Sequence, residues 1–411
     1  MKFSIIAVGD ELLIGQVNDT NTGEIARRFG EIGWEVNDAL VIADDADAIT
    51  SAIDRAFRAT DVVLMTGGLG PTKDDITKAT LLRYFGGEMI YDETVLANIE
   101  KVFERRGLKM NELTHRQAEV PSSCEVIQNE VGTAPIMWFE KTGKVLVSMP
   151  GVPFEMRAAL EKIAPKLEAH FPNDLKIVRR TLLVTDITES ALAQRLEAWE
   201  TNLPKFAHLA YLPQPGLIRL RLDCHISEKE TDDAARLFDE MKTFVGDNLL
   251  FDDDLPLEAI LLDELKRRGL TVATAESCTG GNIAHRITTI AGSSEAFVGG
   301  IVAYSNKVKR NQLGVSEESL EKHGAVSIAV VEEMASGACR HLGANCAIAT
   351  SGIAGPGGGT EEKPVGTVCI AVAVNGQVTS ETRRFPGNRE RVIDRATSAA
   401  IISLIKELRK H

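Results

Sequence analysis

The stretch Leu270-Thr-Val-Ala-Thr-Ala-Glu-Ser-Cys-Thr-Gly-Gly-Asn-Ile-Ala-His-Arg-Ile-Thr288 changes its hydrophobic pattern at a pair of glycines. The apolar run from Leu270 to Ala273 predicts a short buried strand, and the spacing from Gly281 to Thr288 predicts a helix. Ser277 and Cys278 fall in the turn between them, where a nucleophile can face the free N–H groups of a helix start. Capping the helix is the more ordinary role for a hydroxyl at such a turn. The stretch therefore predicts a strand–turn–helix unit and leaves both roles open for Ser277.

The composition predicts a chain of several domains. At 411 residues, the chain is too long for one core, and its hydrophobic content of 44% is ordinary. Its 46 basic and 59 acidic residues give a formal charge of −13. This balance argues against direct nucleic-acid binding and gives no reason to expect attraction to an anionic membrane.

The cysteine pattern and the apolar runs indicate the compartment. No C-x-x-C pair is present, so neither a disulfide framework nor a structural zinc site is expected, and a reducing environment fits best. The first residues resemble a strand rather than a signal peptide, and no run approaches the length of a membrane-spanning helix. We therefore expect a cytoplasmic protein. The six cysteines are Cys124, Cys224, Cys278, Cys339, Cys346 and Cys369.

We expect a first domain over residues 1–170 in which strands alternate with helices. This alternation predicts βαβ units and a parallel sheet covered on both faces, with ligands bound beyond the carboxyl ends of the strands. The predicted strands are 3–8, 36–41, 61–65 and 144–147, and the predicted helices are 18–33 and 46–57.

The loop Thr66-Gly-Gly-Leu-Gly-Pro-Thr-Lys-Asp-Asp-Ile-Thr77 follows the third of these strands. Its glycine N–H groups can form an anion cradle, and Asp74 and Asp75 can hold a divalent cation against bound phosphates. Its spacing is that of neither a P-loop nor a dinucleotide fingerprint. A Gly-Pro turn followed by acidic helix caps is the alternative interpretation.

Two further loops also follow predicted strands. One is Gly9-Asp-Glu11, with Asn21 downstream, and the other is Met149-Pro-Gly-Val-Pro-Phe-Glu-Met156. Three such loops could meet at one edge of a sheet.

These motifs resemble the amino-terminal domain of the CinA family, the competence/damage-inducible proteins. The stretch Asn129-Glu-Val-Gly-Thr-Ala-Pro135 belongs to the same resemblance. The resemblance implies a molybdopterin-binding-like fold and hydrolysis of ADP-ribose with a divalent metal, Mg²⁺ or a transition metal such as Co²⁺. Asp75 is the leading candidate for the catalytic carboxylate, and Asp74 and Asp75 are the candidate metal ligands. The candidate substrate-binding residues are Gly9, Asp10, Glu11, Asn21, Gly67, Gly68, Gly70, Thr72, Pro150 and Gly151.

The middle segment, residues 171–252, predicts a small α+β domain that resembles a KH-like domain. The Gly-x-x-Gly clamp by which KH domains hold RNA is absent, and acidic residues outnumber basic ones. We expect this domain to serve structure or assembly.

Residues 255–411 predict a third domain, again α/β. Two reactive segments, Tyr304 to Lys309 and Ser351 to Gly359, follow predicted strands. Amide hydrolysis needs a nucleophile and a base, and Lys309 can serve Ser277 as a base only when neutral, hence desolvated. The glycine-rich loop suits a phosphate, with Arg389 or Arg391 adding charge. Taken singly, a solvated lysine and a flexible turn are the ordinary interpretations.

The third domain resembles the carboxy-terminal CinA domain and the stand-alone nicotinamide mononucleotide deamidases. Shared motifs include Thr-Ala-Glu-Ser-Cys-Thr-Gly-Gly, Tyr-Ser-Asn-x-Val-Lys and Ser-Gly-Ile-Ala-Gly-Pro-Gly-Gly. The resemblance implies a Ser277/Lys309 dyad that releases ammonia from nicotinamide mononucleotide without a cofactor, in a protein expected to be a homodimer. By the same resemblance, Glu276 and Tyr304 are further candidate catalytic residues that support the dyad. The candidate substrate-binding residues are Ser351, Gly352, Gly355, Gly357, Arg389 and Arg391.

Two alternatives stay open at this point. In one, Cys278 is the nucleophile, with His285, His323 or His341 as its base. In the other, the chain is a non-catalytic nucleotide-binding module linked to competence or DNA repair.

Overall fold

The computed structural model describes residues 1–72, 75–172 and 176–410. It divides into two compact units, Met1–Val178 with Asp223–Ala234, and Arg179–Leu222 with Ala235–His411. The first predicted domain lies in the first unit and the third lies in the second. The division into three domains at residues 170 and 252 stays a prediction.

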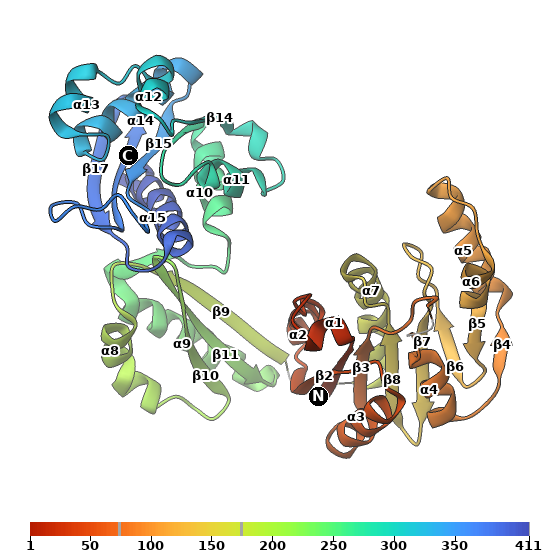
Figure 1. Cartoon of the computed structure of the whole chain (residues 1–411). Helices are drawn as coiled ribbons and strands as arrows, with labels where there is room; N and C mark the ends of the chain where they lie inside the picture. The colour runs from red at the N-terminus through yellow and green to blue at the C-terminus, as the bar shows by residue number, and fades with distance from the viewer. Residues whose placement is uncertain (73–74, 173–175, 411) are drawn as a thin grey trace. The chain divides into compact units, whose positions relative to one another are not determined.

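The first unit contains a six-stranded sheet in the order β2-β1-β3-β8-β7-β6 (Figure 1). Its first four strands are parallel, as predicted, and β7 and β6 add to this sheet as antiparallel strands. A tight turn at Thr142-Gly143, where both residues have positive φ, joins β7 to β8. The strands are β1 (Lys2–Val8), β2 (Glu35–Ile42), β3 (Val62–Thr66), β6 (Cys124–Ile127), β7 (Ile136–Lys141) and β8 (Lys144–Met149).

Helices cover both faces of this sheet, because its strands are apolar on both sides. Residues of α2 and α7 pack with Phe3 and Val62 on one face, whereas residues of α3 and α4 pack with Ile6 and Val63 on the other. Figure 1 shows α2 and α7 on the side of the sheet opposite to α3. The helices are α1 (Asp10–Leu13), α2 (Asn21–Glu31), α3 (Ala46–Ala59), α4 (Thr77–Phe85), α5 (Glu93–Arg105), α6 (Glu112–His115) and α7 (Pro153–His170). A two-stranded sheet pairs β4 (Met89–Tyr91) with β5 (Glu119–Pro121).

The middle of the chain forms a four-stranded sheet in the order β10-β11-β9-β12. The segment combines strands with helices, as expected for the small α+β domain predicted there. The strands are β9 (Lys176–Val184), β10 (Ala207–Gln214), β11 (Leu217–Ile226) and β12 (Leu249–Phe251), and the helices are α8 (Glu189–Thr201) and α9 (Thr231–Val245).

The carboxy-terminal part contains a five-stranded sheet in the order β14-β13-β15-β16-β17. The first three strands are parallel, and β16 and β17 return as antiparallel strands. The strands are β13 (Val272–Glu276), β14 (Phe297–Val302), β15 (Cys346–Gly352), β16 (Thr367–Val374) and β17 (Gln377–Arg384). The helices are α10 (Leu257–Arg268), α11 (Asn282–Thr288), α12 (Asn306–Leu313), α13 (Glu317–His323), α14 (Ile328–Leu342) and α15 (Arg389–Lys410).

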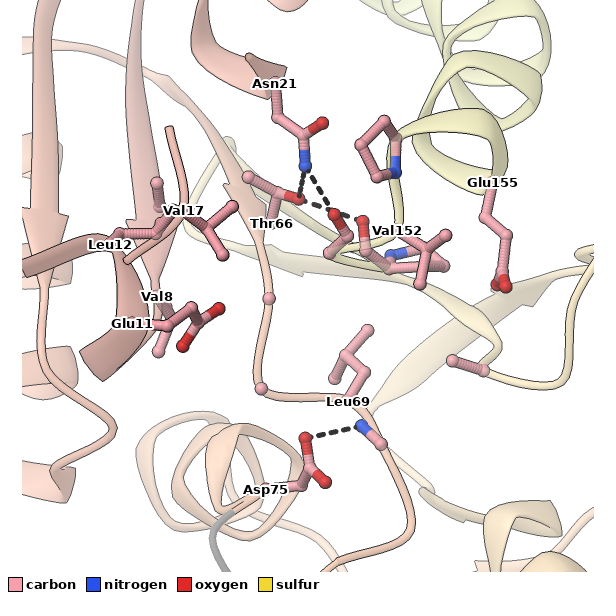
Figure 2. Close-up of a pocket in the computed structure, with 18 of the residues that line it drawn as sticks. Val8, Glu11, Leu12, Val17, Asn21, Thr66, Leu69, Asp75, Val152 and Glu155 are labelled. Carbon is pink, nitrogen blue, oxygen red and sulfur yellow. Dashed lines mark hydrogen bonds between the residues drawn. The ribbon is translucent and has the colours of Figure 1, made fainter. Parts of the chain in front are cut away.

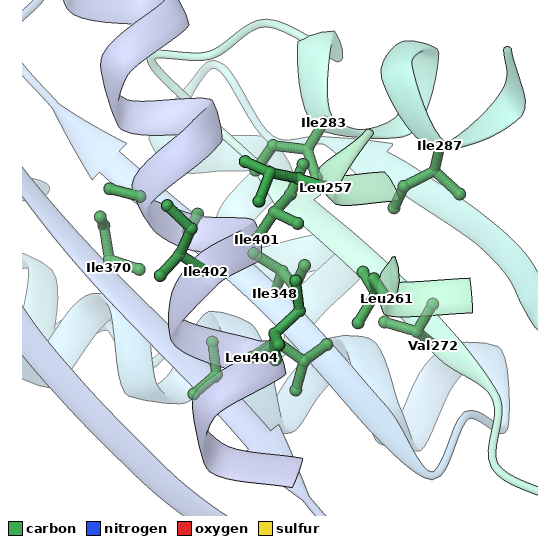
Figure 3. Packing of buried hydrophobic residues seen from close by; sticks show 14 of the residues in the cluster. Leu257, Leu261, Val272, Ile283, Ile287, Ile348, Ile370, Ile401, Ile402 and Leu404 are labelled. Atoms are coloured by element: carbon green, nitrogen blue, oxygen red, sulfur yellow. The ribbon is translucent and has the colours of Figure 1, made fainter. Parts of the chain in front are cut away.

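The two faces of this second sheet have different cores. On one face, Ile348 of β15 packs with large side chains of α10, α11 and α15, and Figure 3 shows Leu257, Ile283 and Ile401 gathered there. On the other face, the neighbouring Ala347 and Ala349 pack against α14. Alternation along one strand thus separates large from small residues. Both large sheets combine parallel and antiparallel strands, and the predicted α/β fold class is confirmed. Among the residues described, none of the helices has the length and apolar character needed to span a membrane.

Candidate functional site

Three strand ends meet where the sequence places its reactive segments in the carboxy-terminal sheet. Glu276, the last residue of β13, pairs with Val302 of β14 and Thr350 of β15. The Ser277 N–H donates to the Thr350 carbonyl at 2.9 Å, which holds the following turn against β15. Parallel strands therefore bring Ser277 and the segment after β14 to one edge of the sheet, as the fold predicts.

Ser277 and Lys309 form a buried pair. The Lys309 Nζ lies 2.9 Å from the Ser277 Oγ and donates to the Ala303 carbonyl at 2.7 Å. Lys309 lies in the first turn of α12 and is 1% exposed, so it is not a solvated helix-start lysine. Among the described residues, no carboxylate lies within ion-pair distance of it. Burial without a counter-ion lowers the pKa of Lys309, and a partly neutral amine beside a hydroxyl can act as its base.

Cys278 is a poor alternative nucleophile. Its side chain is 6% exposed, and burial raises the pKa of its thiol to about 12. His285, His323 and His341 lie on α11, α13 and α14, and none of them lines the cavity around Ser277. A nucleophilic cysteine needs a thiolate, so the geometry favours Ser277.

A cavity of about 200 Å³ opens over the dyad. Tyr304 and Arg389 belong to its wall, and the Arg389 guanidinium donates to the Tyr304 Oη at 2.9 Å and to the Gly355 carbonyl at 2.8 Å. This fork places a positive charge at the cavity, where it can bind an anionic substrate group. The lining residues are Ser277, Cys278, Tyr304, Asn306, Lys309, Ala325, Val326, Ser351, Gly352, Ala354 and Arg389.

The remaining candidate residues of this domain lie outside the cavity or are already bonded. Arg391 lines a separate cavity beside Pro215, so Arg389 is the arginine at the dyad. Gly357 is exposed and outside the lining, whereas Ser351 lines the cavity and its hydroxyl donates to the Ala325 carbonyl at 2.6 Å.

Glu276 caps α11 instead of facing the cavity. Its carboxylate accepts the N–H groups of Gly281, Ile283 and Ala284 at 2.9–3.1 Å, and it also accepts the Thr279 hydroxyl at 2.8 Å. The carboxylate is buried at the positive end of the helix, which stabilises its charge. A catalytic role for Glu276 was predicted; the geometry instead makes it a positioning residue. Because Glu276 satisfies these N–H groups, Ser277 is free of the cap role.

A second cavity, of about 570 Å³, lies at the carboxyl edge of the first sheet. It gathers the three loops that the sequence singled out, and Figure 2 shows Glu11, Asn21 and Asp75 around it. The predicted residues that line it are Glu11, Asn21, Gly67, Gly68, Gly70, Asp75, Pro150 and Gly151. Gly9, Asp10 and Thr72 stand beside the cavity without lining it.

Asn21 fastens these loops together. Its Nδ2 donates to the Thr66 Oγ1 at 3.1 Å and to the Gly151 carbonyl at 2.8 Å, and Thr66 donates to the Pro150 carbonyl at 2.9 Å (Figure 2). Gly67 has a φ of 107°, and a Cβ there would lie 2.1 Å from the Val8 carbonyl oxygen. A glycine is therefore required where the cradle passes the end of β1.

Asp75 closes the glycine loop. Its carboxylate accepts the N–H of Gly70 at 2.7 Å and that of Thr72 at 3.0 Å, and it is also bonded to the Thr72 hydroxyl. The other predicted metal ligand, Asp74, lies outside the described residues. In the described ranges, no three Asp, Glu, His or Cys side chains are close enough to form a metal site outright.

Asp44, which the sequence analysis missed, brings a further carboxylate to this edge. Its carboxylate accepts the Asp10 N–H at 3.1 Å. Burial raises the pKa of Asp44, and the nearby charges of Asp10, Glu11 and Asp75 raise it further. Crowded hard oxygen donors with uncompensated charge fit a divalent cation. The signal in the sequence was present, because Asp44 follows β2 at the edge where the other loops gather.

Comparison with known proteins identifies the family. Residues 4–169 match the "Probable molybdopterin binding domain", and residues 254–408 match the "CinA C-terminal domain". A CinA-like protein of Flavobacterium psychrophilum is 43% identical over 100% of this chain and 99% of its own length. The chain belongs to the CinA family.

Other proteins are similar in sequence to nearly the whole chain or to part of it. A CinA-like protein of Cytophaga hutchinsonii is 42% identical over 98% of this chain and 96% of its own. The competence damage-inducible protein A of Klebsiella pneumoniae, known from a crystal structure, is 41% identical in sequence. The match covers 37% of this chain and 95% of that protein's chain, with a TM-score of 0.37.

A second polar pair supports the turn that carries Ser277. The Thr279 and Thr350 hydroxyls lie 2.7 Å apart and are both buried, so they link the turn to the end of β15. Sequence inspection named neither residue. A threonine at a strand end is common, and only the pairing of β13 with β15 brings these two together.

Proposed function

We propose that the carboxy-terminal domain hydrolyses the amide of nicotinamide mononucleotide to nicotinate mononucleotide and ammonia. The observation that carries this proposal is the 2.9 Å contact between the Ser277 Oγ and a buried Lys309 Nζ that has no carboxylate partner among the described residues. The family resemblance supplies the identity of the substrate, and the geometry supports amide hydrolysis.

The reaction divides into two halves. Neutral Lys309 takes the proton of Ser277 as its Oγ attacks the carboxamide carbon, and it returns that proton to the nitrogen that leaves as ammonia. Water then attacks the resulting ester, giving one proton to Lys309, and Ser277 regains its proton as the acid leaves. Arg389 at the cavity wall can bind the substrate phosphate, and the Tyr304 hydroxyl orients that guanidinium.

The test is release of ammonia and nicotinate mononucleotide by the full-length protein. We expect turnover of nicotinamide mononucleotide in the presence of a chelator, and full turnover by a Cys278→Ala variant. Absence of ammonia from the folded wild type, or loss of turnover only when Cys278 is removed, contradicts the proposal. A non-catalytic module would be stabilised by the mononucleotide against heat without forming product.

We infer a second activity, hydrolysis of the ADP-ribose diphosphate, for the amino-terminal domain. It is favoured by a glycine cradle and four neighbouring carboxylates at one cavity. Two of these carboxylates, Asp44 and Asp75, together with phosphate oxygens of the substrate, would hold a divalent cation, Mg²⁺ or a transition metal such as Co²⁺, and Asp10 and Glu11 would add negative charge nearby. The cation would supply charge neutralisation and polarisation at the phosphates. The test is metal-dependent formation of AMP and ribose 5-phosphate from ADP-ribose. We further propose that the protein acts as a homodimer, which light scattering on the full chain can check.

A further inference from the structure

Glu155 is a buried carboxylate on the wall of the amino-terminal cavity that the proposed cation site does not use. It lies in the first turn of α7, is 8% exposed and lines the cavity. In Figure 2 it reaches toward the pocket from α7, on the side away from Glu11. The carboxylates that act on Asp44 are Asp10, Glu11 and Asp75, so Glu155 stands apart from that group.

One oxygen of this carboxylate is fixed by the loop between β6 and β7. The Asn129 Nδ2 donates to the Glu155 Oε2 at 2.7 Å and to the Ala134 carbonyl at 2.9 Å. Gly132 makes room for the carboxylate, because a Cβ there would lie 1.8 Å from the same oxygen. The loop therefore holds the carboxylate in one orientation.

The other oxygen has no partner among the residues that the structure describes. Among the described residues, no Lys, Arg or His lies within ion-pair distance of Glu155. The Oε1 atom is not completely buried, so it is accessible to solvent or to a ligand. The N-terminus of α7 offsets part of the negative charge. A fixed acceptor that faces a cavity selects for a hydrogen-bond donor in the ligand.

The position of Glu155 indicates which donor this is. Gly151 abuts Gly67 of the phosphate cradle, since a Cβ on Gly151 would lie 3.2 Å from the Gly67 Cα. Glu155, Gly151 and Gly67 line the same cavity, so a ligand whose phosphates lie at the glycine loop can reach Glu155 with a neighbouring group. In ADP-ribose, a ribose flanks the diphosphate on each side, and the nearest donors to the phosphates are ribose hydroxyls.

We propose that Glu155 is a specificity-determining residue that accepts a hydrogen bond from a ribose 2′-hydroxyl of the diphosphate substrate. This inference rests on the function proposed for the amino-terminal domain. Acidic side chains read ribose hydroxyls in dinucleotide-binding folds by the same chemistry. A deoxyribose would leave the buried Glu155 carboxylate without a hydrogen-bond donor, and the cost of burying it unpaired adds to the loss of the bond. The site should therefore bind a deoxyribose analogue more weakly.

The experiment measures dissociation constants by calorimetry with the full-length protein and added Mg²⁺. A methylene group replaces the bridging oxygen of the diphosphate in every ligand, so that binding is measured without cleavage. The ligands are ADP-ribose, its analogue lacking the adenosine 2′-hydroxyl, and its analogue lacking the 2′-hydroxyl of the terminal ribose. We expect one analogue to bind the wild type about 30-fold more weakly than ADP-ribose, and its identity shows which ribose is read. Binding of both analogues within about threefold of ADP-ribose overturns the inference without any variant.

Glu155→Gln then tests the residue itself. Because Gln retains an oxygen for Asn129, we expect the variant to fold and its discrimination to fall to about threefold. If all three ligands weaken in parallel and the discrimination persists, Glu155 only supports the loop and the inference fails. Glu130→Gln is the matched control: Glu130 is exposed, lies in the same loop and pairs with Lys162, so discrimination should be unchanged.

Cleavage of ADP-ribose with added Mg²⁺ or Co²⁺ is assayed separately. Binding with discrimination but without cleavage contradicts the pyrophosphatase proposal and leaves the ribose contact standing. Cleavage of ADP-ribose without discrimination between the ribose analogues contradicts the ribose contact and leaves the pyrophosphatase proposal standing. Absence of ADP-ribose binding contradicts both proposals.

Discussion

The two candidate sites occupy the same position on similar sheets but carry opposite charge problems. At the carboxy-terminal site, one lysine is buried without an anion and its pKa is lowered. At the amino-terminal site, several carboxylates crowd one cavity, and the pKa of Asp44 is raised. Both shifts have burial as their largest cause, and both oppose the charged form.

Under the proposed functions, this difference separates a carboxy-terminal site that works without a cofactor from an amino-terminal site that uses a divalent cation. A lysine can relieve its burial by releasing a proton, and the neutral amine is the form that a serine nucleophile needs. Carboxylates beside a phosphate subsite cannot use that solution, because a bound diphosphate adds further negative charge. A divalent cation relieves the repulsion on both sides.

Among the changes that leave the Ser277 nucleophile in place, the largest expected effect comes from removing the base. Lys309→Met keeps an apolar stem in the same space but cannot accept a proton, so ammonia release should fall by about 10³-fold. Cleavage of ADP-ribose by the same preparation should not change. A variant that retains more than about a tenth of wild-type deamidation would contradict the base assignment.

Chelation should divide the two activities. Excess EDTA should lower ADP-ribose cleavage by at least about 100-fold and leave ammonia release from nicotinamide mononucleotide unchanged, because only the amino-terminal site relies on a cation. Re-addition of Mg²⁺ or Co²⁺ serves as the control. Equal sensitivity of both reactions to EDTA would break the contrast.

The pH dependence of deamidation should report the lowered pKa of Lys309. Below that pKa the amine is protonated, so kcat/KM should rise about tenfold per pH unit and then level off. In the unfolded chain the lysine titrates near 10.5, so its contribution to the free energy of unfolding is complete above that value and falls as pH drops toward the folded pKa. A rate that falls with rising pH over this range would show that Lys309 acts as a cation.

The smallest effect is expected at Glu276. Glu276→Gln weakens the cap of α11, which should lower stability by about 1 kcal/mol and reduce kcat modestly, because the turn that carries Ser277 loosens. Thermal denaturation and steady-state kinetics measure the two effects. Loss of activity as severe as that of Lys309→Met, at unchanged stability, would return Glu276 to a catalytic role.

The sequence predicted the positions of the candidate site residues better than it predicted the role of each residue. Ser277 and Lys309 were found because each follows a predicted strand, and parallel strands align their ends. The burial of Lys309 could not be inferred, because it depends on how α12 packs. Glu276 was expected to act in catalysis, but three helix N–H groups hold its carboxylate. The antiparallel strands β7 and β17 were missed. The edge strand β17 has Val378 as its one apolar residue, so it lacks the alternation of apolar and polar residues that reveals a strand.

The most direct test of the central contrast is a paired assay on Ser277→Ala. Ammonia release from nicotinamide mononucleotide and metal-dependent cleavage of ADP-ribose are measured on one preparation, with thermal denaturation confirming that it is folded. The account predicts that ammonia release is abolished while ADP-ribose cleavage continues at the wild-type rate. Full ammonia release by the folded variant would contradict the Ser277/Lys309 dyad.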